Sequence, residues 1–298
     1  MKNQNSYCSV FNEDASETVA YNNPLFPLYV HLGKLSSYPD YSAISHWHMD
    51  LEFIIIKKGQ MTYNVNGNLI NLTENNGIMV NSRQLHYGFS PEHQECEFVC
   101  ILFSPELFSG NAWFYQNFIE PVIQNFSCPY LYLDNNGWHN AVLQKLDAIY
   151  HCSFTDSAPY FDLIGLFNGI FQLLYQNITG RGAIPKQESE ELSSLKNMIS
   201  YVEDHFADHI TLKDLALAGT CCKSRCNILF KKYLRDTPVS YINKLRLRKS
   251  LDLLLESDIS ITNIALTCGF SGASYYCEIF HKYYGISPFQ YRKLYSKI

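Results

Sequence analysis

The chain has 298 residues, of which 47% are hydrophobic and 17% are charged, so it can form two domains that each bury a core and is not disordered throughout. Its N-terminal stretch lacks the apolar core of a secretory signal, and its most apolar segment, residues 161–178, is interrupted by polar side chains, so neither export nor a membrane span is expected. The ten cysteines include no Cys-x-x-Cys pair, which favours reduced thiols in a cytoplasmic protein.

Charge is distributed unevenly along the chain, whose net charge is −5. From residue 195 onward there are 15 Lys and Arg against 9 Asp and Glu, a net charge of +6. The first 194 residues carry 8 against 19, a net charge of −11. A basic domain joined to an acidic one predicts a polyanionic partner for the basic part alone.

Residues 24–104 consist of short runs in which apolar and polar residues alternate, separated by turn signals such as VNGN at 65–68 and ENNG at 74–77. Such runs are typical of strands joined by hairpins, so this part is predicted to be antiparallel β structure. The polar segment before it, residues 1–23, is expected to be an N-terminal arm.

The stretch HWHMDLEFIIIKKG places His46, His48 and Glu52 at even offsets, so on a strand their side chains share one face. Its spacing resembles the first motif of cupin barrels, and GIMVNSRQLH, which ends at His86, is similar to the second. Asp40 stands where the first motif usually has a glycine, and the second motif lacks its proline. Three imidazoles and a carboxylate suit a Zn, Fe, Ni or Mn ion, so these four residues are a candidate metal site: His46, His48, Glu52 and His86.

The same residues also suit a polar effector bound without a metal, which the resemblance to sensory domains of this kind implies. Ring nitrogens, a carboxylate and the nearby Tyr63 and Arg83 can bind hydroxyl groups, and aromatic walls suit the faces of sugars. A carbohydrate is therefore the expected ligand. The predicted effector-binding residues are His46, His48, Glu52, Tyr63, Arg83 and His86.

From Ser104 the pattern changes to longer helical periods. The segment at residues 160–177 is apolar on a wide face, which must be covered by its own domain or by a second copy. Helices around residues 138–177 are therefore expected to join two chains into a homodimer. The stretch TGRGAIPKQESEE, residues 179–191, contains two glycines, a proline and a charged run, and it follows neither a helical nor a strand periodicity. It is predicted to link a domain at 24–178 to one at 192–298.

Residues 212–242 and 261–291 align as two copies of one unit, with Ala216 matching Ala265. Each copy has a short helix, a tight turn and a second helix whose apolar residues follow the spacing i, i+3, i+4, i+7. This is the pattern of a helix-turn-helix. The apolar positions of the two second helices are Cys226, Leu229, Phe230 and Tyr233, and Tyr276, Ile279, Phe280 and Tyr283.

The remaining faces of the two second helices are predicted to contact DNA. Small and hydrogen-bonding side chains near a helix N-terminus can reach base edges in the major groove. Lysines farther along can bind phosphates, which sets position without specifying sequence. The predicted DNA-binding residues are Lys223, Ser224, Arg225, Asn227, Ile228, Lys231 and Lys232 in the first copy, and Ala273, Ser274, Tyr275, Cys277, Glu278 and Lys282 in the second.

Residues 195–298 resemble the DNA-binding domain of the AraC/XylS family of transcription regulators. RLRKSLDLLLES, from Arg246, is similar to the helix that joins the family's two helix-turn-helix units, and GISPFQYRK, from Gly285, to its closing signature. Glu278 stands where the family often has arginine, and Thr220 where it usually has the turn glycine. The resemblance implies an α+β fold, in which a cupin-like antiparallel β-barrel with flanking helices precedes an all-α domain of two helix-turn-helix units.

The resulting prediction is a cytoplasmic regulator, not an enzyme and without a cofactor. It is expected to bind double-stranded DNA as a homodimer, to respond to a small effector, and to activate transcription with RNA polymerase as a partner and no role for a membrane. Two alternatives stay open: a metal-dependent cupin enzyme with an accessory domain, and a regulator that senses metal or redox state. The sensor would use the barrel histidines or the cysteines Cys221, Cys222 and Cys226.

Overall fold

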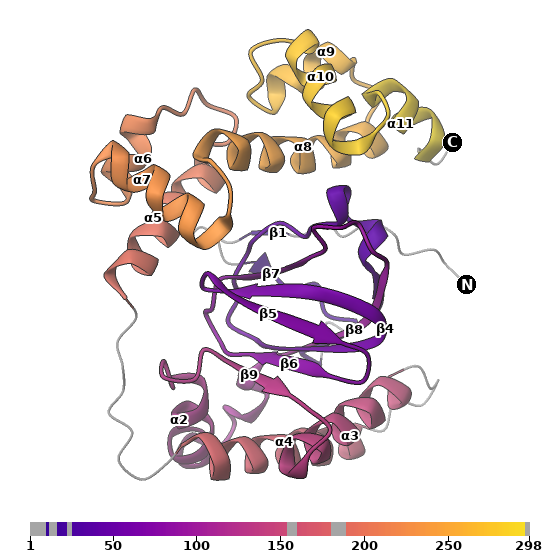
Figure 1. The fold of residues 1–298 in the computed structure, drawn as a ribbon, viewed down its shortest axis with the longest axis vertical. Helices are drawn as coiled ribbons and strands as arrows, with labels where there is room; N and C mark the ends of the chain where they lie inside the picture. Colours follow the sequence, from indigo (N-terminus) through magenta and orange to yellow (C-terminus); the bar gives the residue numbers. More distant parts are fainter. Residues whose placement is uncertain (1–9, 12–16, 23–25, 154–159, 180–188, 296–298) are drawn as a thin grey trace. The chain divides into compact units, whose positions relative to one another are not determined.

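The computed structural model forms two compact units, one at residues 17–188 and one that contains residues 189–298 (Figure 1). Most of the expected N-terminal arm and most of the expected linker lie outside the described residues. No helix in the described part of the chain is both long enough and apolar enough to cross a membrane. The described residues are 10–11, 17–22, 26–153, 160–179 and 189–295.

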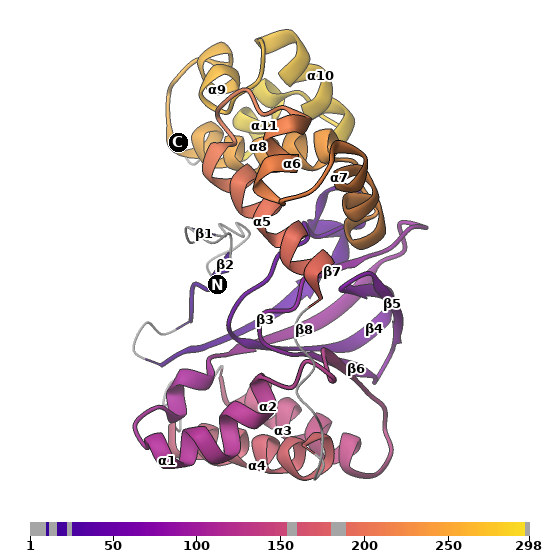
Figure 2. The same cartoon turned by 90° about the vertical axis from the view of Figure 1, so that its left-hand side faces the viewer.

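The N-terminal unit is built on a seven-stranded antiparallel sheet, which confirms the antiparallel structure predicted for this region. Its strands lie in the order β3-β8-β4-β6-β9, and β5 and β7 both pair with the second half of the long strand β4 (Figure 2). Strands β1 (Val10–Phe11) and β2 (Glu17–Thr18) precede this sheet. Its members are β3 (Leu28–Lys34), β4 (Leu51–Val65), β5 (Asn68–Thr73), β6 (Gly77–Val80), β7 (His86–Phe89), β8 (Cys96–Phe103) and β9 (Tyr130–Leu133).

A bulge divides β4 into two parts. Its register against β8 shifts by one residue between Ile56 and Lys58, and an extra residue on one strand reverses the face to which later side chains point. Even-numbered residues before the bulge, such as Ile54, therefore share a core with odd-numbered residues after it, such as Tyr63. Glu52 lies on the same face as Ile54, so the bulge brings Tyr63 to its side of the sheet.

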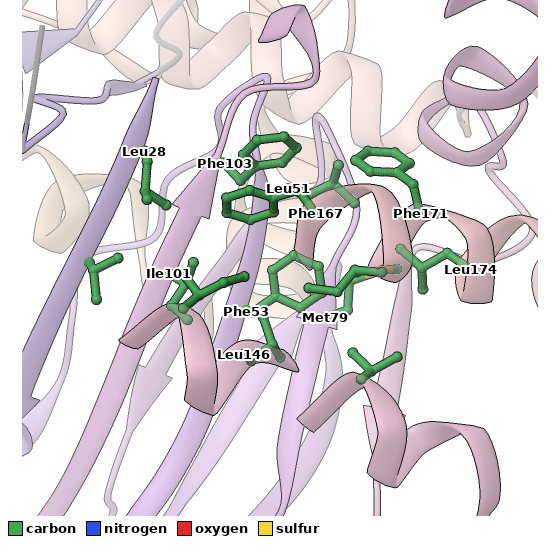
Figure 3. Packing of buried hydrophobic residues seen from close by; sticks show 14 of the residues in the cluster. Leu28, Leu51, Phe53, Met79, Ile101, Phe103, Leu146, Phe167, Phe171 and Leu174 are labelled. Carbon is green, nitrogen blue, oxygen red and sulfur yellow. The ribbon is translucent and has the colours of Figure 1, made fainter. Parts of the chain in front are cut away.

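The opposite face of the sheet is covered by the helices of the same unit (Figure 3). The Phe167 ring of α4 stacks on Phe103 of β8, with ring centroids 3.7 Å apart, and the apolar face of α4 is buried. Full burial of each such side chain contributes about 1.5–3 kcal/mol. The helical segments are η1 (Leu35–Ser37), η2 (Pro39–Tyr41), η3 (Pro105–Phe108), α1 (Ala112–Phe114), η4 (Tyr115–Ile119), α2 (Glu120–Ile123), α3 (Gly137–Cys152) and α4 (Tyr160–Ile178).

Residues 189–295 contain helices and no strands, which confirms the predicted fold class. Helices α6 and α7 form the first helix-turn-helix, α9 and α10 form the second, and α8 joins them (Figure 1). The segments are α5 (Glu190–His205), α6 (Leu212–Ala218), α7 (Lys223–Leu229), the π-helical turn η5 (Phe230–Leu234), α8 (Pro238–Glu256), α9 (Ile261–Thr267), α10 (Ala273–Tyr284) and α11 (Pro288–Tyr295).

The two copies share their helix caps. Thr211 starts α6 by accepting a hydrogen bond from the backbone N–H of Asp214, and Ser260 starts α9 in the same way. After each first helix the chain enters the left-handed region, at Thr220 with φ 50° and at Gly269 with φ 79°. The structure therefore places Thr220 at the position of the turn glycine, as the alignment predicts.

The second turn also packs against the end of α5. A Cβ atom on Gly269 would lie 2.5 Å from the carbonyl oxygen of Phe206, so only glycine fits there. Arg246 of α8 donates to the same carbonyl at 2.7 Å and to the carbonyl of Asp208 at 2.7 Å. These contacts hold the two helix-turn-helix units in a fixed arrangement relative to each other.

Candidate functional site

The predicted effector residues of the N-terminal unit come from three segments of the chain. His46 forms an isolated antiparallel bridge with His86, the first residue of β7, while Glu52 lies in β4. His48 lies in the irregular segment between them, where Met49 is 46% exposed. The expectation that these residues occupy one continuous strand is wrong, because the chain leaves its bridge to β7 and turns before β4 begins to pair with β8.

The segments nevertheless bring His46, His48, Glu52 and His86 together, with one potential ligand atom from each lying within 4.8 Å of the others. His86 Nε2 lies 3.4 Å from Glu52 Oε1, and His48 Nε2 lies 3.7 Å from Glu52 Oε2. His48 and His86 are 1% exposed and Glu52 is 3% exposed. These four residues form a polar cluster, here called the His/Glu cluster, in which His48, Glu52 and His86 are buried and His46 is half-buried.

Hydrogen bonds fix the orientation of all three imidazole rings. Nδ1 of each ring lies at hydrogen-bond distance from a backbone carbonyl: His46 from Ile44 at 2.9 Å, His48 from Asp50 at 3.1 Å and His86 from Gln84 at 2.7 Å. A carbonyl only accepts, so in the neutral ring each Nδ1 carries the hydrogen and each Nε2 carries the lone pair.

The carboxylate at the centre of the cluster is ionised. Burial alone would raise the pKa of Glu52, but the nearby imidazoles of His86 and His48 outweigh it and hold that pKa well below its usual range. Burial and then the Glu52 carboxylate raise the pKa of Tyr63, whose hydroxyl donates to Glu52 Oε1. Tyr63 therefore lies beside the His/Glu cluster and donates a hydrogen bond to its carboxylate.

The structure does not bring Arg83 into the cluster. Its side chain is exposed and its Nε lies 3.3 Å from the sulfur of Met49. Two neighbours were missed: Asp50, which accepts from the Tyr21 hydroxyl at 2.8 Å, and Cys100, whose sulfur lies 3.8 Å from Glu52 Oε2. Asp50 lies two residues from His48 and two from Glu52, so the alternating pattern of the sequence could have predicted its position. No sequence pattern links Cys100 or Tyr21 to these residues.

In the first helix-turn-helix, α7 exposes most of the residues that are predicted to contact DNA. The exposed side chains are Lys223, Ser224, Arg225, Asn227 and Ile228, followed by Lys231 and Lys232 in η5. Arg225 and Lys232 are bound by Glu191 of α5, with Lys232 Nζ 2.5 Å from Glu191 Oε2. Arg225 of α7 and Lys232 of η5 therefore both reach α5, and no local sequence pattern indicates this ion pairing.

In the second helix-turn-helix, α10 exposes Ser274, Tyr275, Glu278 and Lys282, while Ala273 and Cys277 are half-buried. The Tyr275 hydroxyl accepts a hydrogen bond from Asn243 of α8 at 2.8 Å. Lys282 lies in the last turn of the helix, so α10 presents fewer cations than the corresponding part of the first copy.

The cysteine cluster lies in the turn of the first helix-turn-helix. The sulfur atoms of Cys221 and Cys226 are 3.6 Å apart, and Cys222 is exposed at the N-cap of α7. Burial, and then the hydrogen bond with Cys221, raise the pKa of Cys226 to about 12, so its thiol stays protonated. Cys226 packs as a small apolar residue of the helix interface, which supports a structural role over a redox role.

Two family models match these units: an AraC-like ligand binding domain at residues 29–125 and a helix-turn-helix domain at residues 221–294. The chain is 29% identical over 255 residues to the uncharacterized HTH-type transcriptional regulator YdeC of Bacillus subtilis. The aligned segment covers 84% of this chain and 86% of YdeC. Over 99 residues it is 33% identical to the HTH-type transcriptional activator RhaS of Escherichia fergusonii. This shorter aligned segment covers 33% of this chain and 36% of RhaS.

Among solved structures, ToxT from Vibrio cholerae with a bound unsaturated fatty acid is similar to this chain, with 13% sequence identity. The superposition covers 94% of this chain and 99% of the ToxT chain. The TM-score is 0.47, too low for its site residues to be compared with those described above.

A sheet domain with a buried polar cluster and a domain with two helix-turn-helix units define a DNA-binding regulator with a separate ligand-binding domain. The two matched segments together span more than half of the chain. The chain belongs to the AraC family of helix-turn-helix transcription regulators. This family is non-enzymatic, which removes the cupin-enzyme alternative.

Proposed function

We propose that the chain activates transcription by placing α7 and α10 in two neighbouring segments of the major groove, under the control of a small effector bound at the His/Glu cluster. The observation that carries this proposal is the doubled helix-turn-helix, in which both second helices expose their polar faces. Activation is supported by the similarity to the HTH-type transcriptional activator RhaS. Contact with RNA polymerase is the further expectation that an activating role would carry.

Direct reading of bases is assigned to the side of α7 that faces away from its packed stripe, where Ser224, Asn227 and Ile228 are exposed. Lys231 is exposed one turn farther along and suits a phosphate. In α10, Ser274 and Glu278 occupy the matching face, and a carboxylate there suits the N4 amino group of cytosine. The two helices therefore carry different chemistry and should read different sequences.

This proposal is tested by selecting duplexes from a random-sequence library with the purified full chain, and then titrating the selected duplex at several salt concentrations. Asn227→Ala should change the preferred bases at particular positions, with a cost of about 1–3 kcal/mol at those positions. Lys231→Ala should weaken binding to all sequences alike and reduce the salt slope by about 1. Failure to enrich any sequence, or affinity that does not depend on salt, would contradict the proposal.

We also propose that two chains form a homodimer through the N-terminal unit. The most apolar face of α4 is already buried against its own sheet, so a dimer would use the outer faces of α3 and α4, where Phe161 is 93% exposed. Light scattering on the full chain, with Phe161→Ser as the variant, tests this arrangement. A mass of one chain over the concentrations that bind DNA would contradict it.

The carbohydrate effector stays a prediction based on residue chemistry. The cluster atoms lie within 4.8 Å of one another, so a sugar would have to separate these side chains before its hydroxyl groups could bind between them. A thermal-shift screen of neutral sugars against the full chain tests this prediction. A sugar that stabilises the native chain but not the Glu52→Gln variant would support it.

A further inference from the structure

The His/Glu cluster presents ligand atoms without the short contacts of an ion pair. Charge-assisted hydrogen bonds between imidazolium and carboxylate groups are usually about 2.7–2.9 Å long. Here Nε2 of His86 and of His48 lie 3.4 Å and 3.7 Å from the Glu52 oxygens. Two ligands bound to one ion at about 2.1 Å in tetrahedral geometry lie about 3.4 Å apart, so these spacings fit ligands around a shared metal ion.

The ring nitrogen of His86 supports the same conclusion. Its Nε2 is buried, and it has no hydrogen-bond partner within the part of the chain that the structure describes. A buried polar atom left in this state is costly, and coordination of an ion would satisfy it. Because Nδ1 of the same ring is held by the Gln84 carbonyl, Nε2 presents its lone pair to the cluster when the ring is neutral.

The surroundings of the cluster also match a metal site. A metal-binding histidine usually donates its other ring N–H to a carbonyl or carboxylate, and here all three rings meet backbone carbonyls. Glu52 is oriented by the Tyr63 hydroxyl. The backbone bridge between His46 and His86, with N–H to carbonyl distances of 3.1 Å and 2.9 Å, fixes two of the ligands opposite each other.

We propose that His46, His48, Glu52 and His86 bind a divalent first-row transition-metal ion, and, resting on the proposed function, that this ion is the effector of the regulator. Three imidazoles and one carboxylate suit Zn²⁺, Fe²⁺, Ni²⁺ or Mn²⁺, and they do not suit Ca²⁺ or Mg²⁺, which prefer oxygen ligands. The ion would join the segment before β4 to β4 and β7. Asp50, within that segment, accepts a hydrogen bond from Tyr21, so the same ion would also steady the start of this unit.

The test uses the full chain, stripped with a chelator and titrated with Co²⁺, whose visible absorption reports coordination by nitrogen and oxygen; Zn²⁺ is then added as the competitor. We expect one Co²⁺ per chain. His86→Gln should weaken binding more than about 100-fold and Tyr63→Phe about 10-fold, since even outer-shell partners change metal affinity 10–100-fold. His139→Gln is the matched control, because His139 belongs to the same unit and pairs with Asp134 away from the cluster.

Circular dichroism of each variant shows whether it is folded, and Tyr63→Phe removes only a hydroxyl, so it keeps the test valid if His86→Gln does not fold. Absence of Co²⁺ binding, or equal binding by the control and the cluster variants, would overturn the site. Metal binding with identical DNA titrations for the stripped and the loaded chain would overturn its role as effector. Metal binding by a chain that binds no duplex would instead remove the proposed DNA function and leave the site standing.

Discussion

Glu191, at the start of α5, holds two of the cations that the sequence assigns to DNA. Its carboxylate contacts Arg225, Lys232 and the Tyr233 hydroxyl. Hydrogen bonds from Lys232 and Tyr233, together with the charges of Lys232 and Arg225, hold the pKa of Glu191 below its usual range, so it is ionised at neutral pH. Partly exposed ion pairs of this kind contribute at most about 1 kcal/mol to stability, so phosphates can compete with Glu191 for both cations.

Replacing this carboxylate should strengthen DNA binding. In Glu191→Gln, Arg225 and Lys232 lose their intramolecular counter-charge and become available to phosphates. We expect several-fold tighter binding at low salt and a plot of log K against log salt that is steeper by up to about 2, close to one unit for each phosphate newly neutralised. The control is Glu190→Gln, which makes the same change of charge one residue earlier. Equal effects of the two variants would show that only net charge matters.

The turn of the first helix-turn-helix carries strain that the second does not. Thr220 is β-branched and adopts φ 50°, a region in which glycine is favoured. Thr220→Gly should therefore raise the free energy of unfolding by about 1 kcal/mol, the usual cost of a left-handed residue with a side chain. Urea unfolding of the full chain measures it, and Gly269→Ala should be destabilising in the same assay. An unchanged or lowered stability for Thr220→Gly would contradict the assignment.

At the scale of elements, the bulge in β4 decides which residues meet at the cluster. Lys57 is the extra residue, because Ile56 and Lys58 lie opposite consecutive residues of β8. Deletion of Lys57 should turn Met61, Tyr63 and Val65 away from the core that they share with Ile54 and prevent the N-terminal unit from folding. Soluble yield and thermal unfolding measure the loss.

The control for this deletion is Lys57→Ala, which keeps the length of the strand. It removes the ion pair between Lys57 Nζ and Asp147 Oδ1, 2.6 Å apart and partly exposed. Such a pair is worth less than about 1 kcal/mol, so the variant should fold nearly normally. If the deletion and the substitution behave alike, the bulge does not set the register.

The same elements explain what could be predicted from sequence. Caps and apolar stripes are local signals, so residues such as Thr211 and Phe230 sufficed to predict the doubled helix-turn-helix. The cluster was predicted from alternation on one strand, although His48 lies outside any strand. Alternation does not reveal a bulge, and the ion pairs of Glu191 join residues more than thirty positions apart, so neither could be read from the chain.

At the scale of the whole molecule, the acidic half should weaken the attraction of the basic half to DNA. Residues 17–188 carry 7 Lys and Arg against 15 Asp and Glu, a net charge of −8, and residues 189–298 carry 15 against 11, a net charge of +4. A fragment of residues 189–298 should bind non-specific duplex more tightly than the full chain at low salt, and the two should converge at high salt as the charges are screened. Fluorescence anisotropy measures both, and a fragment that binds no better would show that the acidic half has no such effect.

Gly269 and Arg246 both contact the Phe206 carbonyl at the end of α5, so the two helix-turn-helix units cannot turn independently about α8. One added base pair rotates one part of an operator against the other by about 34–36°, because B-DNA has about 10–10.5 base pairs per turn. Two helix-turn-helix units joined by a flexible hinge could follow that rotation, whereas two units in a fixed arrangement cannot. The number of bases between the two contacted segments, including bases that the protein never touches, should therefore be as strictly fixed in its operators as the contacted bases themselves.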